Sequence, residues 1–77
     1  MARVRYFAAA AERAGTDEEQ RFETTLGELR DALARERPGL AAILAQCAVL
    51  VDGSRAPDTA AIDGDITVDV LPPFAGG

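Results

Sequence analysis

The sequence has no histidine, no tryptophan and no lysine, and its only cysteine is Cys47. The lack of histidine excludes a histidine-based catalytic triad and the metal sites that histidine and cysteine form together. We therefore expect no bound metal. One cysteine cannot form a disulfide bond within the chain, and the apolar neighbours Ala48 and Val49 favour a small buried side chain over a reactive thiol.

Two kinds of segment are also missing from the sequence. The opening residues show no basic stretch followed by an apolar one, as a secretion signal would. No apolar run is long enough to span a membrane. We expect a cytoplasmic protein that has no membrane partner.

The chain is short and acidic. Its 77 residues form one small domain, which buries roughly 60% of the surface of the unfolded chain and leaves no room for a deep catalytic cleft. Thirteen acidic residues outnumber eight arginines, and the net charge of -5 repels nucleic acid and anionic lipid. Without lysine, no side-chain amine forms Schiff bases or attacks an activated acyl group. These limits argue against a self-sufficient enzyme and against a nucleic-acid partner.

Alternation of polar and apolar residues predicts a strand near each end of the chain, at residues 3–7 and 66–71. The residues expected to face the core are Val4, Tyr6, Ile66, Val68 and Val70. Phe7 and Leu71 fall on the opposite face, together with Arg5. If the two strands are neighbours, this face carries two exposed apolar side chains and is a candidate docking surface.

The main helix has a clear start and end. Residues 25–28 have the Thr-x-x-Glu spacing of a capping box, which predicts a helix that begins at Leu26. Leu26, Leu29 and Leu33 then lie on one stripe of this helix. The Pro-Gly pair at residues 38–39 ends it.

Shorter elements fill the rest of the chain. Residues 8–15 favour a short helix with a terminal glycine, and the acidic residues 17–23 predict an edge strand. Residues 40–44 predict a further short helix, and residues 48–51 a short apolar strand that turns back at residues 52–53. This order of elements predicts an α+β fold of the β-grasp type, in which the main helix covers one face of a small mixed sheet.

The last six residues, 72–77, have the sequence PPFAGG and carry no charged side chain. We expect a β-grasp domain over residues 1–71 followed by this extended tail, because Pro72 and Pro73 stop the strand and hold the chain away from the body. The two terminal glycines have no Cβ and fit a narrow channel of a partner. A terminus that is merely frayed is the alternative.

Three motifs are spread over the whole chain: Val-x-Tyr-Phe-Ala at residues 4–8, the Ile-x-Gly-Asp turn at residues 62–65, and Pro-Pro-x-x-Gly-Gly at residues 72–77. Together with the order of elements, they resemble the MoaD/ThiS family of sulfur carriers, and most of all the small subunits of molybdopterin synthase. The Pro-Pro-x-x-Gly-Gly ending is the specific part, because ubiquitin-like proteins share the fold pattern.

The resemblance implies that an E1-like activating enzyme uses ATP to adenylate the carboxylate of Gly77, which is then converted to a thiocarboxylate. A larger synthase subunit would pass this sulfur to cyclic pyranopterin monophosphate in molybdenum cofactor biosynthesis. The chain itself would bind no cofactor, because ATP is a substrate of the activating enzyme. The expected site residues are Gly76 and Gly77 at the reactive end, and Phe7, Leu71, Pro73, Phe74 and Ala75 in partner binding.

Two alternatives stay open. A ThiS-like carrier for thiazole synthesis would use the same terminal chemistry, although those chains are usually shorter. A ubiquitin-like module that binds partners without covalent chemistry would carry the two terminal glycines by chance.

Overall fold

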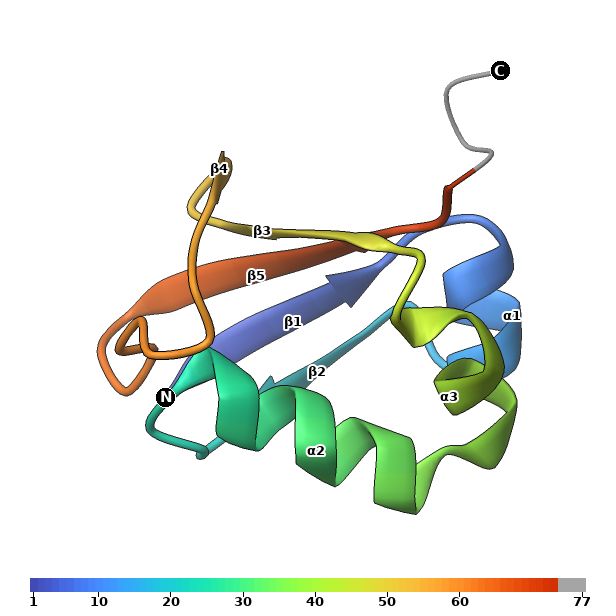
Figure 1. Ribbon diagram of the computed structural model, residues 1–77, viewed down its shortest axis with the longest axis horizontal. Helices are drawn as coiled ribbons and strands as arrows, with labels where there is room; N and C mark the ends of the chain where they lie inside the picture. The colour runs from blue at the N-terminus through green and yellow to red at the C-terminus, as the bar shows by residue number, and fades with distance from the viewer. Residues whose placement is uncertain (74–77) are drawn as a thin grey trace.

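Within residues 1–73, which the computed structural model describes, five strands form one mixed sheet and three helices lie against one of its faces (Figure 1). The strands follow the order β2-β1-β5-β3-β4 across the sheet. The elements are β1 (Ala2–Tyr6), α1 (Ala9–Ala14), β2 (Glu18–Arg21), α2 (Leu26–Glu36), α3 (Pro38–Leu44), β3 (Ala48–Val51), β4 (Ser54–Arg55) and β5 (Ile66–Leu71). The predicted α+β fold of the β-grasp type is confirmed.

The first and last strands pair in the middle of the sheet. β1 runs parallel to β5, and their register joins Ala2 with Ile66 and Tyr6 with Val70. β2 is antiparallel to β1 on one side, and β3 is antiparallel to β5 on the other. The hairpin between β3 and β4 turns at residues 52–53, whose φ angles of 47° and 85° suit a tight two-residue turn.

The core lies between the inner face of the sheet and the helices. Its strand residues include Val4, Tyr6, Val68 and Val70, all buried, with Ile66 partly buried beside them. On α2, Leu26, Leu29 and Leu33 are each at most 1% exposed and complete the core from the helix side. The predicted inward faces of both strands and of the main helix are therefore confirmed.

The predicted capping box is present at the start of α2. The Glu28 amide donates to the Thr25 hydroxyl oxygen at 3.2 Å, and the Glu28 carboxylate accepts from the Thr25 amide at 3.2 Å. The helix begins at Leu26, as predicted, and ends at Glu36. Pro38 is the first residue of α3, where its fixed φ and missing N–H are tolerated.

The edge strand β2 is shorter than the predicted strand at residues 17–23. It lies at the edge of the sheet, as predicted, but covers only Glu18–Arg21. Phe22 follows the strand and is 75% exposed. Because all four residues of β2 are polar, this strand has no apolar side chain to bury, and other contacts must hold it.

One of these contacts is a small charged cluster under β2. The Tyr6 hydroxyl donates to Glu19 Oε2 at 2.5 Å, and Arg37 Nη2 donates to the same oxygen at 2.7 Å. Arg37 also donates to the carbonyl oxygen of Ala14 at the end of α1. Burial, followed by the bond to Glu19, raises the pKa of the Tyr6 hydroxyl, so the group stays protonated and remains a donor.

A second contact is made by Arg21, which joins β2 to the end of α2. Its guanidinium donates twice to Glu23, at 3.0 and 2.8 Å, and twice to Glu36, at 2.8 and 3.0 Å. Only 11% of the Arg21 side chain is exposed, so these bonds are shielded from water on the arginine side. They raise the pKa of Arg21 and lower the pKa of both carboxyls.

Acid should weaken the fold through Glu19. Burial alone would raise the pKa of this carboxyl, but bonds from Tyr6 and Arg37 outweigh burial and hold the pKa below its usual value of 4.5. The resulting stabilisation is present above pH 4.5 and is lost as the pH falls through the folded pKa. We predict that Glu19→Gln costs about 1–3 kcal/mol at neutral pH and flattens the loss of stability in acid, as measured by urea unfolding.

Glu12→Gln is the matched control, because Glu12 is exposed on α1 and makes no ion pair with any residue from 1 to 73. It should leave the stability at neutral pH unchanged. If the Glu19→Gln chain lost stability in acid as steeply as the parent, the Glu19 carboxylate would not be a source of the acid sensitivity.

Candidate functional site

The adjoining ends of β1 and β5 place Phe7 beside Leu71. The register pairs Tyr6 with Val70, so the next residues, Phe7 and Leu71, follow side by side. The Phe7 amide donates to the Val70 carbonyl at 3.1 Å, which continues the pairing past the end of β1. Phe7 is 37% exposed and Leu71 is half-buried, both on the face opposite the core. The structure thus brings together the two strand residues that were predicted to dock a partner.

Strand β3 extends this face. Ala48 pairs with Leu71, and Leu50 pairs with Asp69. Val49 is buried in the core, so alternation directs Ala48 and Leu50 to the outer face, where both are half-buried. We call Phe7, Leu71, Ala48 and Leu50 the outer apolar patch. Sequence reasoning missed the two β3 residues because every residue of that strand is apolar, which hides the alternation.

An ion pair lies beside the outer apolar patch. Arg5 Nε and Nη2 donate to the two carboxylate oxygens of Asp69, at 2.7 and 2.9 Å. Hydrogen bonding and the charge of Asp69 raise the pKa of Arg5. The guanidinium carbon also lies 5.5 Å from the centre of the Phe7 ring. A partner that covers this face therefore meets a paired charge, which costs less to desolvate than an isolated one.

The chain leaves the sheet at the border of the patch. β5 ends at Leu71, after which Pro72 is buried and Pro73 is exposed. Proline has no N–H to continue the pairing, which accounts for the end of the strand. The other predicted site residues, Phe74, Ala75, Gly76 and Gly77, lie outside the described residues. We call Pro72 and Pro73 the root of the tail, which therefore lies directly after Leu71.

Cys47 does not add a reactive thiol to the outer apolar patch. Cys47 is 8% exposed, and burial raises the pKa of its thiol, which packs as a small apolar group in the core. In the part of the chain that the structure describes, no three His, Cys, Asp or Glu side chains are placed to hold a metal ion. No helix between residues 1 and 73 has the length and apolar character needed to cross a membrane.

Phe7 is followed by a strained turn. Ala8 has a φ of 50° and a ψ of -125°. These are the angles of the first central position of a type II′ turn, which glycine usually occupies. The Ala10 amide donates to the Phe7 carbonyl at 3.0 Å and closes the turn. Such backbone strain costs about 1–3 kcal/mol and is enriched at functional sites. The turn defines where β1 ends and therefore where Phe7 stands.

Comparisons with known proteins agree with this fold. The sequence profile of the ThiS family matches residues 4–77. SAMP1 from Haloferax volcanii is 25% identical, with a TM-score of 0.76 over 99% of this chain and 98% of its own. A complex of subunits 1 and 2 of molybdopterin-converting factor from Helicobacter pylori contains a chain that is 25% identical, with a TM-score of 0.74 over 99% of this chain and 97% of that chain.

One further structure shows the fold alone. A putative molybdopterin converting factor subunit 1 from Pyrococcus furiosus has a TM-score of 0.79 at 20% identity, over 95% of this chain and 97% of its own. No curated protein matches the sequence.

We predict that Ala8→Gly stabilises the domain by about 1 kcal/mol, because glycine adopts the backbone angles of Ala8 without strain. The relief of about 1–3 kcal/mol exceeds the roughly 0.4–1 kcal/mol by which glycine favours the unfolded chain. The midpoint of urea unfolding measures the change. Ala11→Gly, inside α1, is the matched control and should lower the midpoint. A lower midpoint for Ala8→Gly would show that this turn is not strained.

Proposed function

Because the chain belongs to the ThiS family, we propose that it is a sulfur carrier and acts in the cytoplasm as the small subunit of molybdopterin synthase. The carboxylate of Gly77 attacks the α-phosphate of ATP in an E1-like activating enzyme and releases pyrophosphate. A sulfur donor then displaces AMP from the acyl adenylate and leaves a thiocarboxylate. The larger synthase subunit transfers this sulfur to cyclic pyranopterin monophosphate in molybdenum cofactor biosynthesis.

The position of the outer apolar patch at the root of the tail is the observation that carries this proposal. Phe7 and Leu71 lie where the chain leaves the sheet, and the tail at residues 72–77 has no charged side chain. A partner that binds the patch therefore receives the chain terminus within reach of its own surface. Glycines at the end fit a narrow channel, and the prolines reduce the entropy that the tail loses on binding.

We infer two partners for this chain. Phe7, Leu71, Pro73, Phe74 and Ala75 contact the partner, and Gly76 leads Gly77 into its active site. The likeness to a complex of subunits 1 and 2 of molybdopterin-converting factor supports a larger synthase subunit as one partner. The activating enzyme is the second partner, and it binds and consumes the ATP, so this chain needs no cofactor of its own.

A second candidate function uses the same activated terminus. SAMP1, at 25% identity, is by its name a small archaeal modifier protein, which favours attachment of this chain to other proteins. In that reaction a lysine amine of the target attacks the adenylate, forms an amide bond with Gly77 and releases AMP. This chain has no lysine, so its own side chains offer no such acceptor. A ThiS-like carrier for thiazole synthesis differs from the first proposal only in the protein that receives the sulfur.

We predict that deletion of Gly77, or one residue added beyond it, abolishes sulfur loading and leaves the fold intact, because the core is built from residues that precede the tail. Intact mass after incubation with ATP, an activating enzyme and a sulfur donor should show one oxygen replaced by sulfur in the parent only. Equal urea midpoints check the fold. Loading of the Gly77-deleted chain at the parent rate would place the reactive group elsewhere, and a parent that gains no sulfur would contradict the carrier function.

The outer apolar patch is tested by Phe7→Asp and Leu71→Asp, each of which puts a carboxylate on a surface that a partner would desolvate. We predict that each weakens binding to the larger synthase subunit by about 2 kcal/mol or more, roughly thirtyfold in Kd, as measured by calorimetric titration. Far-UV circular dichroism should not change, because both side chains lie outside the core.

Phe22→Asp is the matched control for these two variants. It makes the same chemical change at an exposed phenylalanine beyond β2, away from the root of the tail. Its affinity for the synthase subunit should equal that of the parent. If all three variants bound alike, the outer apolar patch would not be the interface.

A further inference from the structure

The outer edge of strand β2 is open to further pairing. β2 is the first strand in the sheet order, and no other strand formed by residues 1–73 lies beyond it. A strand at the edge of a sheet presents backbone N–H and C=O groups that an added extended segment can bind. β2 is short and its exposed side chains are polar, so a segment that pairs with it must also match its charges.

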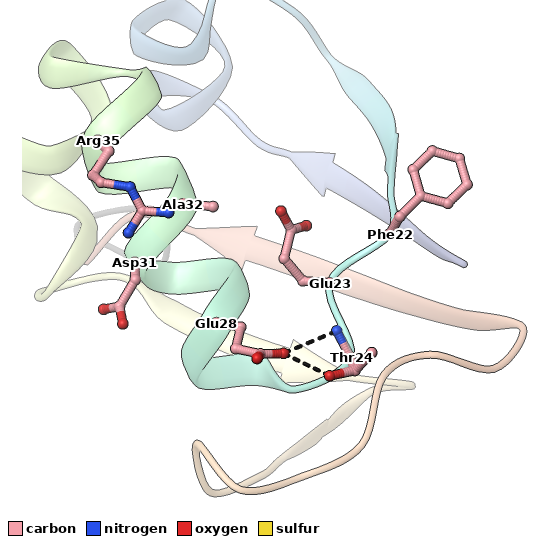
Figure 2. A pocket seen from close by; sticks show the side chains of 7 residues that line it. All are labelled: Phe22, Glu23, Thr24, Glu28, Asp31, Ala32 and Arg35. Carbon is pink, nitrogen blue, oxygen red and sulfur yellow. Dashed lines mark hydrogen bonds between the residues drawn. The ribbon is translucent and has the colours of Figure 1, made fainter.

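A groove runs beside this edge, between the segment that follows β2 and helix α2 (Figure 2). Its volume is about 500 Å³. Ala32, a small residue that is 4% exposed, contributes from α2, and Phe22 stands on the opposite side with 75% of its surface exposed. Figure 2 shows Asp31 and Arg35 on the helix side and Phe22 on the strand side. The Phe22 ring points away from α2, so the groove has a shallow wall at Ala32 and an exposed aromatic side chain at its rim.

The charged side chains of β2 and the groove that are available to a ligand are mainly negative. Asp31 makes no ion pair or side-chain hydrogen bond within the described part of the chain, and Glu28 uses only Oε1 for its capping bonds. Glu18, on β2, has a 3.5 Å contact with Arg3 in which both side chains are more than half exposed, and such pairs contribute little. Arg35 is the one cation of the groove lining. Within the groove lining, two carboxylates, Asp31 and Glu28, are thus available to a ligand beside one guanidinium.

We propose that β2 and this groove bind an extended basic segment of a partner protein. The segment pairs with the outer edge of β2, packs an apolar side chain against the exposed Phe22 at the rim of the groove, and directs lysine or arginine toward Asp31 and Glu28. A second copy of this chain fits poorly, because each copy has a net charge of -5.

This surface is separate from the outer apolar patch, so the inference does not rest on the proposed function. Arg21 pairs with Ala2, which places Phe22 near the start of β1, whereas Phe7 follows the end of the same strand. Five residues of extended strand span about 17 Å. A partner on β2 and a partner on the patch can therefore be bound at the same time.

Two blocked peptides test the proposal. One alternates lysine and valine around a central phenylalanine, and the other has glutamate in place of each lysine. Backbone amide shifts recorded by NMR should respond to the lysine peptide in a saturable way at residues 18–24 and 28–35, and should not respond to the glutamate peptide. Phe22→Ser should weaken binding of the lysine peptide about tenfold, and Asp31→Asn about threefold.

Two more variants distinguish binding at the groove from general electrostatic attraction between the basic peptide and the acidic chain. Arg35→Gln removes the cation of the groove and should tighten binding of the lysine peptide about threefold, the opposite sign to Asp31→Asn. Glu12→Gln removes a carboxylate from α1, which does not line the groove, and should leave the affinity unchanged.

Four results would overturn the proposal. They are equal binding of the two peptides, equal weakening by Glu12→Gln and Asp31→Asn, shifts centred on the outer apolar patch, and shifts at β2 that depend on protein concentration without peptide. The last result would mean that a second copy of the chain occupies the edge.

Discussion

The parallel pairing of β1 with β5 is the constraint on which the rest of the structure depends. It buries Val4 and Val68 as direct neighbours in the centre of the core. The same register sets Phe7 beside Leu71 on the other face. Because side chains alternate along a strand, a shift by one residue would turn the core residues toward solvent and separate the two halves of the outer apolar patch. Core packing and the candidate docking face are therefore two consequences of one register.

Strand β2 is attached in a different way from the central strands. It has no apolar residue, so its position depends on pairing with β1 and on the ion pairs made by Glu19 and Arg21. Arg37 connects this cluster to the end of α1. These contacts are directional and come from the inner face, so they hold the strand without covering its outer edge. An edge secured in this way can be both ordered and accessible.

Local patterns predicted the elements that nearby residues determine. Alternation located the strand at residues 66–71, and the capping box located the start of α2 at Leu26, because neither depends on distant contacts. The outward positions of Phe7 and Leu71 also followed from alternation, but that they are neighbours needed the fold of the resembled family. Leu50 and the ion pairs of β2 were missed, because an all-apolar strand hides its faces and long-range pairs leave no mark on sequence spacing.

The use of arginine at positions 5 and 21 has a structural reason in this fold. Arg5 binds both oxygens of Asp69, and Arg21 binds two carboxylates with two bonds each. A lysine ammonium presents its donors from a single atom and cannot reproduce these parallel bonds. Arginine also stays protonated at any pH at which the protein folds, so it is not a nucleophile. Arg5, beside the root of the tail, can thus hold the sheet together without attacking the activated carboxyl group that is proposed at Gly77.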